Sequence, residues 1–111
     1  MLDAVTGQLE RYMDLLSARQ KLVASNIANV DTPGYHTQDF DFQAEFQNAA
    51  GGPPRVGDVL GLQIKNDGND VSLDREARLL SENALRFQIA SALMRTEIRV
   101  ERSAIEEGRN G

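Results

Sequence analysis

The chain has 111 residues, a formal net charge of −5 and no cysteine. At this length it forms at most one domain with a small core. Its 12 Lys and Arg against 17 Asp and Glu give no basic surface for a nucleic acid, and the lack of cysteine excludes disulfide bonds and thiolate metal sites. With only 5% aromatic residues and no Trp, a pocket for a small-molecule substrate is hard to build. We therefore expect no cofactor, no metal and no nucleic-acid partner.

The first residues lack the basic and apolar regions of a cleavable signal peptide, and no run approaches the roughly 18 apolar residues of a membrane-spanning helix. On these grounds alone the chain is expected to be cytoplasmic.

Apolar residues recur at alternating steps of four and three from residue 8 onwards, which predicts a helix over residues 8–30. Gly7 precedes it as a weak helix interruption. The predicted seam of this helix consists of Leu9, Met13, Leu16, Gln20, Val23, Ile27 and Val30. Gln20 is its polar exception, and a polar seam residue more often sets the register of a helix pair than binds a ligand.

An enforced turn follows the helix. Pro33 pushes Thr32 towards extended backbone, so the helix should stop near Asp31. Pro33-Gly34 has the residues of a type II turn, with a fixed φ followed by a residue free to take positive φ.

Asn26 and Asn29 lie one helical turn apart beside this turn, where side-chain amides can bond the last carbonyls of a helix. Two interpretations stay open from the residues alone. The segment is either an ordinary helix end or a docking turn whose amides are held for another chain.

The middle of the chain, residues 36–71, is predicted to be irregular and poorly ordered in a free monomer. Phe40, Phe42 and Phe46 can lay their rings on the helices or on a neighbouring subunit. Residues 48–57 are rich in Gly and Pro and form no regular element, whereas residues 59–64 followed by the turn 66–70 are compatible with a small β-hairpin.

A second helix is predicted over residues 73–107, with Ser72 as its N-cap and Gly108 as its stop. Its expected seam is Leu73, Ala77, Leu80, Ala84, Phe87, Ser91, Met94, Ile98, Glu101 and Ile105. A second apolar row, formed by Leu85, Ile89, Leu93 and Val100, widens the apolar face beyond what one partner helix covers.

These elements predict a mainly α fold: an antiparallel coiled-coil hairpin of the N- and C-terminal helices, joined by a flexible loop with a short β-hairpin. The whole chain, residues 1–111, is one domain, in which residues 31–71 form the turn and loop.

Catalytic interpretations are weak. His36 is the only histidine and has no second ligand for a metal, so a structural or exposed role is favoured. Asp39 and Asp41 are a candidate carboxylate pair but are expected to be solvated loop charges. The segment 67–70 fails as a calcium loop, because Gln63 and Lys65 occupy the positions of its first acidic ligands.

The segment 24–35 reads Ala-Ser-Asn-Ile-Ala-Asn-Val-Asp-Thr-Pro-Gly-Tyr and resembles the N-terminal signature of the bacterial flagellar rod and hook proteins. Two further segments, residues 66–76 and 83–88, are similar to those of a proximal rod member of that family. The resemblance implies an axial building block of the basal body, with paired terminal helices, that leaves the cell through the type III export apparatus without a cleaved signal. The implied location is the rod in the periplasmic space.

The predicted function is accordingly a structural rod subunit that polymerises through its terminal helices into a torque-transmitting shaft. The implied partners are other rod proteins, further copies of the chain, an adaptor at the membrane ring and the export gate. The residues expected to join subunits are Asn26, Asn29, Asp31, Thr32, Pro33, Gly34 and Tyr35. Alternatives are a coiled-coil adaptor or export-associated assembly factor, which the heptads alone would favour, and a small hydrolase acting through the carboxylates near His36.

Overall fold

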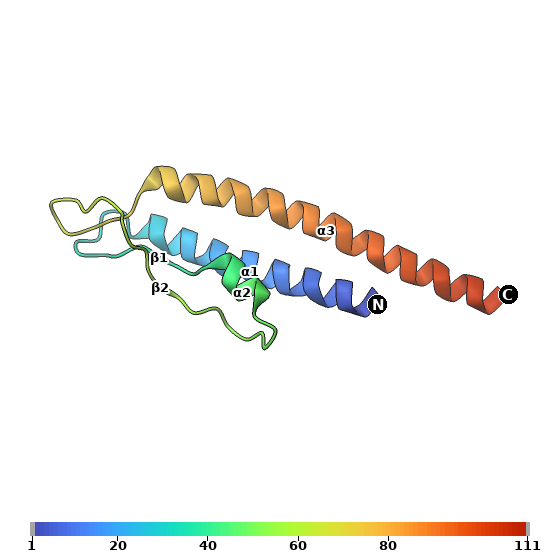
Figure 1. The fold of residues 1–111 in the computed structure, drawn as a ribbon. Coiled ribbons are helices and arrows are strands. Elements are labelled where there is room, and N and C mark those ends of the chain that lie inside the picture. The colour runs from blue at the N-terminus through green and yellow to red at the C-terminus, as the bar shows by residue number, and fades with distance from the viewer. Residues whose placement is uncertain (1, 111) are drawn as a thin grey trace.

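The computed structural model describes residues 2–110 and the side chains of residues 4–109. Two long helices, α1 (Leu2–Ala28) and α3 (Leu73–Asn110), lie side by side and antiparallel in a body of 71 × 26 × 17 Å (Figure 1). Between them the chain forms β1 (Gln38–Asp39), α2 (Phe42–Gln47) and β2 (Gly57–Asp58). The predicted fold class, a helical hairpin with a small two-stranded sheet in its loop, is confirmed.

Both long helices continue through glycines at which the sequence predicted an interruption or an end. α1 begins at Leu2 and passes through Gly7, and α3 passes through Gly108. One glycine weakens a helix by only about 1 kcal/mol relative to alanine, which is too little to end a helix with neighbours on both sides. At its other end α1 stops at Ala28, because the chain tightens into i to i+3 bonds: the amides of Asn29 and Val30 donate to the carbonyls three residues earlier, both at 3.2 Å.

The face of α1 in the helix pair follows the expected seam, with Leu16 and Val23 each only 1% exposed. Leu9, Met13 and Ile27 are half-buried on the same face. Gln20 accepts a hydrogen bond from the Nδ2 atom of Asn83 on α3 at 3.1 Å, in keeping with a role in register.

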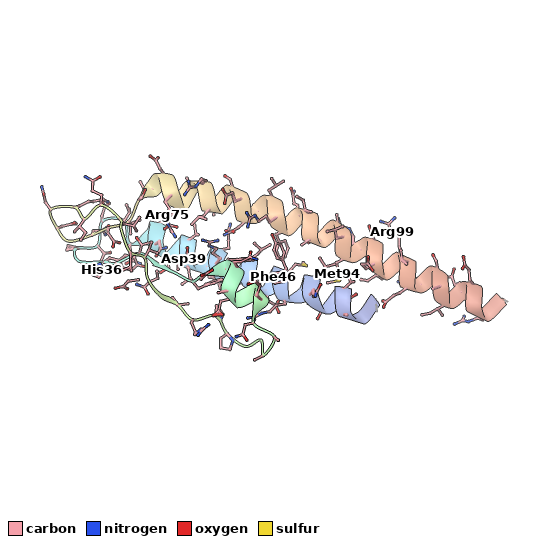
Figure 2. The ribbon with its side chains drawn as sticks, in the orientation of Figure 1. His36, Asp39, Phe46, Arg75, Met94 and Arg99 are labelled. Atoms are coloured by element: carbon pink, nitrogen blue, oxygen red, sulfur yellow. The ribbon has the colours of Figure 1, made fainter. Side chains whose placement is uncertain are left out.

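The register of α3 differs from the prediction by one residue. Leu80, Phe87 and Ile98 were expected in the seam but are 40%, 38% and 43% exposed. The buried face of α3 is instead formed by Glu76, Leu79, Asn83 and Ala90. An apolar pattern could not find this face, because two of its members are polar and one is small. Met94 is half-buried on the side of α3 towards α1, whereas Arg99 points away from it (Figure 2).

The middle segment packs on the helix pair. Phe42 and Phe46 of α2 meet Tyr12 of α1 edge to face, with ring centroids 5.3 and 5.4 Å apart, as the sequence had suggested for these rings. Asp41 caps α2 by accepting a hydrogen bond from the amide of Ala44 at 3.1 Å.

The two strands are not the predicted ones. β1 and β2 pair antiparallel, with Gln38 opposite Asp58, whereas the proposed strand over residues 59–64 is irregular. The low order expected for residues 36–71 in a free monomer stays a prediction. In the described part of the chain, no helix has the length and apolar character needed to cross a membrane.

Candidate assembly site

Two turns close the end of the hairpin. The Tyr35 amide donates to the Thr32 carbonyl at 3.2 Å and Gly34 has a φ of +73°, so residues 32–35 form the predicted type II turn. A second turn, residues 65–68, lies against it, because the Gly34 amide donates to the carbonyl of Asp67 at 2.9 Å. A Cβ atom at Gly68 would lie at a contact distance of 3.4 Å from the Gly34 Cα atom, so the two turns require glycine for its positive φ, +73° at Gly34 and +85° at Gly68, rather than for space.

Asn26 is the centre of this end. Its side chain is buried, and its Nδ2 atom donates to the Gln38 carbonyl at 2.9 Å and to Oε1 of Glu76 at 3.0 Å. Its Oδ1 atom accepts from the Gln38 amide at 3.0 Å and from the Tyr35 hydroxyl at 2.9 Å. One amide therefore joins α1, β1 and α3, and all its hydrogen bonds are made within the chain rather than held for another one.

Two carbonyls just beyond the end of α1 are bonded by a residue from the far side of the loop. Asn69 is fully buried, and its Nδ2 atom donates to the carbonyls of Asn29 and Thr32, both at 2.8 Å. Asn29 itself donates to the Ser25 carbonyl at 2.8 Å, which matches the expected capping role. No pattern in the sequence singles out Asn69, which lies in a predicted turn.

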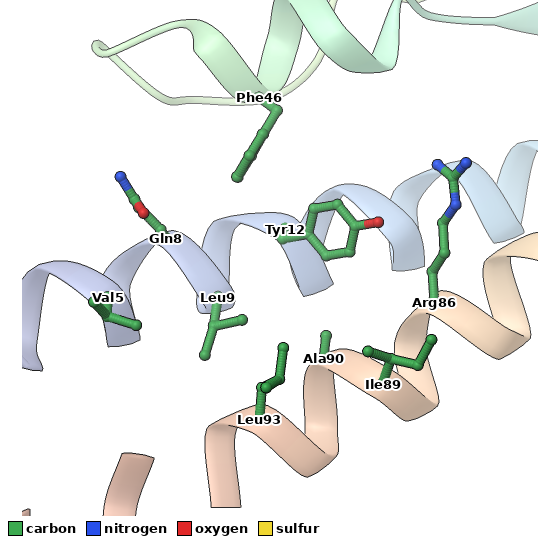
Figure 3. Close-up of a pocket in the computed structure, with 9 residues that line it drawn as sticks. All are labelled: Val5, Gln8, Leu9, Tyr12, Phe46, Arg86, Ile89, Ala90 and Leu93. Atoms are coloured by element: carbon green, nitrogen blue, oxygen red, sulfur yellow. The ribbon is translucent and has the colours of Figure 1, made fainter. Parts of the chain in front are cut away.

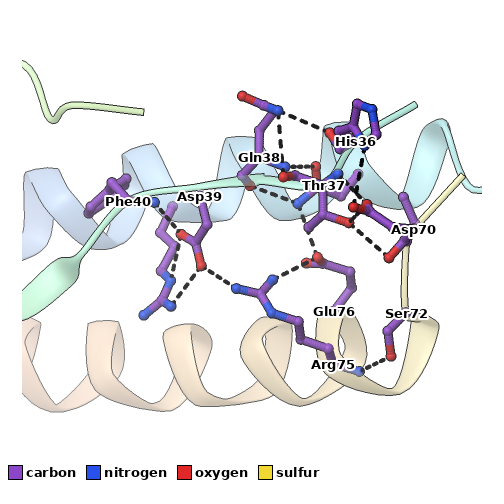
Figure 4. Close-up of polar contacts among 12 residues, drawn as sticks. His36, Thr37, Gln38, Asp39, Phe40, Asp70, Ser72, Arg75 and Glu76 are labelled. Atoms are coloured by element: carbon purple, nitrogen blue, oxygen red, sulfur yellow. Dashed lines mark hydrogen bonds and ion pairs between the residues drawn. The ribbon is translucent and has the colours of Figure 1, made fainter. Parts of the chain in front are cut away.

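Asp39 is not the solvated loop charge that the sequence suggested. The Asp39 residue is 8% exposed. Arg19 of α1 donates hydrogen bonds to both of its carboxylate oxygens, at 3.1 and 2.8 Å, and Arg75 of α3 donates to one of them at 2.6 Å (Figure 4). Burial alone would raise the pKa of Asp39. The hydrogen bonds from Arg19, the Phe40 amide and Arg75 outweigh burial and hold that pKa below its ordinary value.

Glu76 lies beside this ion pair, but its pKa is shifted in the opposite direction from that of Asp39. It is fully buried, and its Oε1 atom accepts from Arg75 at 2.9 Å and from Asn26. Its Oε2 atom has no hydrogen-bond partner among the residues that the structure describes. Burial raises the pKa of Glu76, only partly opposed by Arg75 and Asn26, which favours the neutral acid.

Asp70 fastens the return of the loop to β1. Its Oδ1 atom accepts from the amide and the hydroxyl of Thr37, at 2.6 and 2.8 Å (Figure 4). Burial raises the pKa of Asp70, but the bonds from Thr37 and His36 lower it further than burial raises it. The His36 ring is half exposed, with Nδ1 3.4 Å from Asp70.

The carboxylates near His36 are thus engaged in structural bonds, and Asp41 is a helix cap. Across the described residues, no group of three or more acidic or histidine side chains is placed to hold a metal.

The remaining residues of the predicted docking turn face outwards. Asp31, Thr32, Pro33 and Gly34 are exposed, and Asn29 and Tyr35 are half-buried. The turn therefore presents a solvent-facing edge while the polar network behind it fixes its conformation.

The other open surface is apolar. α3, with 38 residues against 27 in α1, is about 57 Å long against about 40 Å, and its C-terminal part extends beyond the N-terminus of α1 (Figure 1). The second apolar row is exposed as expected, at 49% to 58%: Leu85, Ile89, Leu93 and Val100. Between the N-terminal half of α1 and this part of α3 lies an open groove of about 330 Å³ (Figure 3). Its walls include Val5, Leu9, Tyr12, Phe46, Ile89 and Leu93.

A helix pair with a buried polar network at one end and an uncovered apolar face has the form of a structural subunit. Comparison with known proteins agrees. The family model described as "Flagella basal body rod protein" matches residues 13–36, which span the end of α1 and the closing turn.

The chain is 35% identical to the flagellar basal body rod protein FlgB of Cereibacter sphaeroides, over 76% of this chain and 80% of that protein. It is 30% identical to FlgB of Yersinia enterocolitica, over 97% of this chain and 100% of that protein, and 26% identical to FlgB of Escherichia coli, over 96% of both. The chain belongs to the FlgB family of flagellar basal body rod proteins, and it is a component of the flagellar basal-body rod.

Proposed function

We propose that this rod component polymerises through its terminal helices, with copies of itself and with other rod proteins, into the shaft that transmits motor torque. The observation that carries the proposal is the outer face of α3, where large apolar side chains are about half exposed along the helix. A monomer gains nothing from such a face in water, whereas an assembly buries it at about 25 cal/mol per Å².

The closed end supplies the stiffness that a shaft needs. Asp39 links α1 to α3 through two arginines, and Asn26 links both helices to β1. Sliding one helix along the other would break these buried bonds together, at a cost of several kcal/mol. The exposed edge of the turn at residues 31–34 then meets a neighbouring subunit as a fixed surface.

The proposal extends to location and route. In it, the chain crosses the periplasmic space as part of the rod, passes through the type III export apparatus without a cleaved signal, and contacts an adaptor at the membrane ring and the export gate. The role is mechanical, with no catalysed reaction.

A matched pair of charge substitutions on α3 tests the proposal. Leu85 and Gln88 are both exposed and lie three residues apart on the helix. In the native host, Leu85→Glu should abolish rods in isolated basal bodies and stop swimming, while Gln88→Glu should leave both intact. Far-UV circular dichroism should show that both purified variants keep their helices.

Normal rods with Leu85→Glu would refute assembly through this face. A small closed oligomer formed by the purified chain, without incorporation into basal bodies, would favour the adaptor alternative.

A further inference from the structure

The loop at the closed end carries an aliphatic side chain that the monomer does not cover. Leu60 is 89% exposed and sits in a turn with Gly61, whose φ is +81°. Ile64, further along the same loop, is 64% exposed. The loop is the yellow-green segment at the end of the molecule where the helices are joined (Figure 1). Leu60 and Ile64 together give this loop an apolar projection that another chain can cover.

The groove of Figure 3 has the complementary shape and chemistry at a different level of the hairpin. It is open, largely apolar and about 330 Å³ in volume, and its walls Ile89 and Leu93 are 53% and 51% exposed. Arg86 stands at its rim and forms no ion pair within the described part of the chain. The groove accommodates a few side chains, not a whole helix.

We propose that the groove of one copy receives the Leu60 loop of a second copy. This contact rests on the proposed function, since it joins two subunits of the rod. Leu60 would enter the apolar groove, and Asp58, an exposed acid two residues earlier, would face Arg86. The opposite charges favour this occupant over an uncharged apolar segment.

The loop and the groove are different surfaces of the same chain. Leu93 lies about 30 Å along α3 from its start at Leu73, so the loop and the groove are well separated on one chain. A projection in one place and a hollow in another form a heterologous contact, which adds copies in an open row when successive rotations do not close into a ring.

The C-terminal overhang of α3 is a poorer occupant. Its apolar residues Ile98 and Ile105 are flanked by charges of both signs, including Glu97, Arg99 and Glu106. A helix with such neighbours needs a long mixed groove rather than a short apolar one.

Cysteine cross-linking tests the contact directly, because the chain contains no cysteine of its own. The purified full-length double variant Leu60→Cys/Leu93→Cys is oxidised over a range of protein concentrations and examined by non-reducing electrophoresis. A disulfide needs Cα atoms roughly 4.4 to 6.8 Å apart, so the bond reports direct contact. We expect a ladder of dimers, trimers and longer species, since each copy offers one loop and one groove.

Two controls separate this contact from random collision. Either single variant should stop at dimers, and Leu60→Cys/Ile105→Cys, which pairs the loop with the exposed overhang, should form a ladder at least tenfold more slowly. Arg86→Glu should slow the ladder of the first pair about two- to fivefold, as for an exposed ion pair. Adding Asp58→Arg should restore the rate.

Equal ladders, or none, from both double variants would overturn the proposal, as would a faster ladder from Leu93→Cys/Ile105→Cys. The result is independent of the Leu85→Glu test. Absent cross-linking with normal rods refutes only the groove contact, whereas normal rods with Leu85→Glu refute assembly through α3.

Discussion

Asn26→Ala should be among the most damaging single substitutions at the closed end of the hairpin. It removes four hydrogen bonds from one buried position. The Gln38 amide and carbonyl lose their side-chain partner outright, and each buried group left unpaired costs about 1 to 3 kcal/mol. The Tyr35 hydroxyl lies 3.5 Å from Oγ of Ser25 and can bond there instead, and Glu76 keeps Arg75. We expect a loss of about 3 to 5 kcal/mol, a large part of the roughly 5 to 15 kcal/mol typical of a domain.

Asn29→Ala is the matched control, because it removes the same kind of side-chain amide three residues later, just past the end of α1. Its side chain is only half-buried and makes two bonds, to the Ser25 carbonyl and from the Thr32 hydroxyl. The expected loss is about 1 kcal/mol. Urea unfolding of both variants, followed by far-UV circular dichroism, measures the difference. If Asn26→Ala were no less stable than Asn29→Ala, the amide would not be the centre of this end.

Three further substitutions test the polar network. Gly34→Val places a β-branched residue at a φ of +73°, so it should lower the free energy of unfolding by about 1 to 3 kcal/mol and impair motility. Gly34→Asn should have a smaller effect on both, because Asn tolerates positive φ better than Val. Normal rods in the Gly34→Val variant would count against the turn as a docking surface. Asp39→Asn leaves the part-buried guanidinium of Arg19 without a carboxylate and removes one of the two carboxyl groups that Arg75 meets, so it should cost about 3 to 5 kcal/mol in urea unfolding. Arg55→Ala removes a side chain that is 83% exposed and should cost about 0 to 1 kcal/mol. Burial raises the folded-state pKa of Glu76 above its ordinary value. The stabilising contribution of Glu76 is therefore present below the unfolded-state pKa and is lost as the pH rises through the folded value. The stability of Glu76→Gln relative to the parent should accordingly grow as the pH rises above about 4, and a constant difference would contradict the assignment.

The sequence predicts those parts of the structure that depend on local pattern. Both helices follow from apolar spacing, and the turn follows from Pro33-Gly34, whose backbone preferences act within four residues. The packing of Phe42 and Phe46 on the helix pair could also be anticipated, because aromatic rings amid acidic residues need a surface to cover them.

The polar network cannot be predicted from local pattern, because the residues that bond one another are far apart along the chain. Asp39 meets arginines 20 residues earlier and 36 residues later, and Asn69 bonds a carbonyl 40 residues earlier. Nothing in the segment around Asp39 distinguishes a buried, doubly paired carboxylate from a solvated one. A loop rich in Asp, Asn and Gly reads as flexible, yet Asn69 and Asp70 are among the buried residues.

The one-residue shift in the register of α3 connects the polar network to assembly. Had α3 turned Leu80, Phe87 and Ile98 towards α1, the helix pair would have buried that apolar row and left only the second apolar row uncovered. Instead it buries Asn83 against Gln20 and Glu76 against Asn26, pairs that only this register satisfies. Buried polar pairs add little net stability but penalise the alternatives, since a shifted helix would leave them unbonded. The polar seam thus holds α3 in the orientation that keeps its large apolar side chains uncovered, and this is what assembly through that face requires.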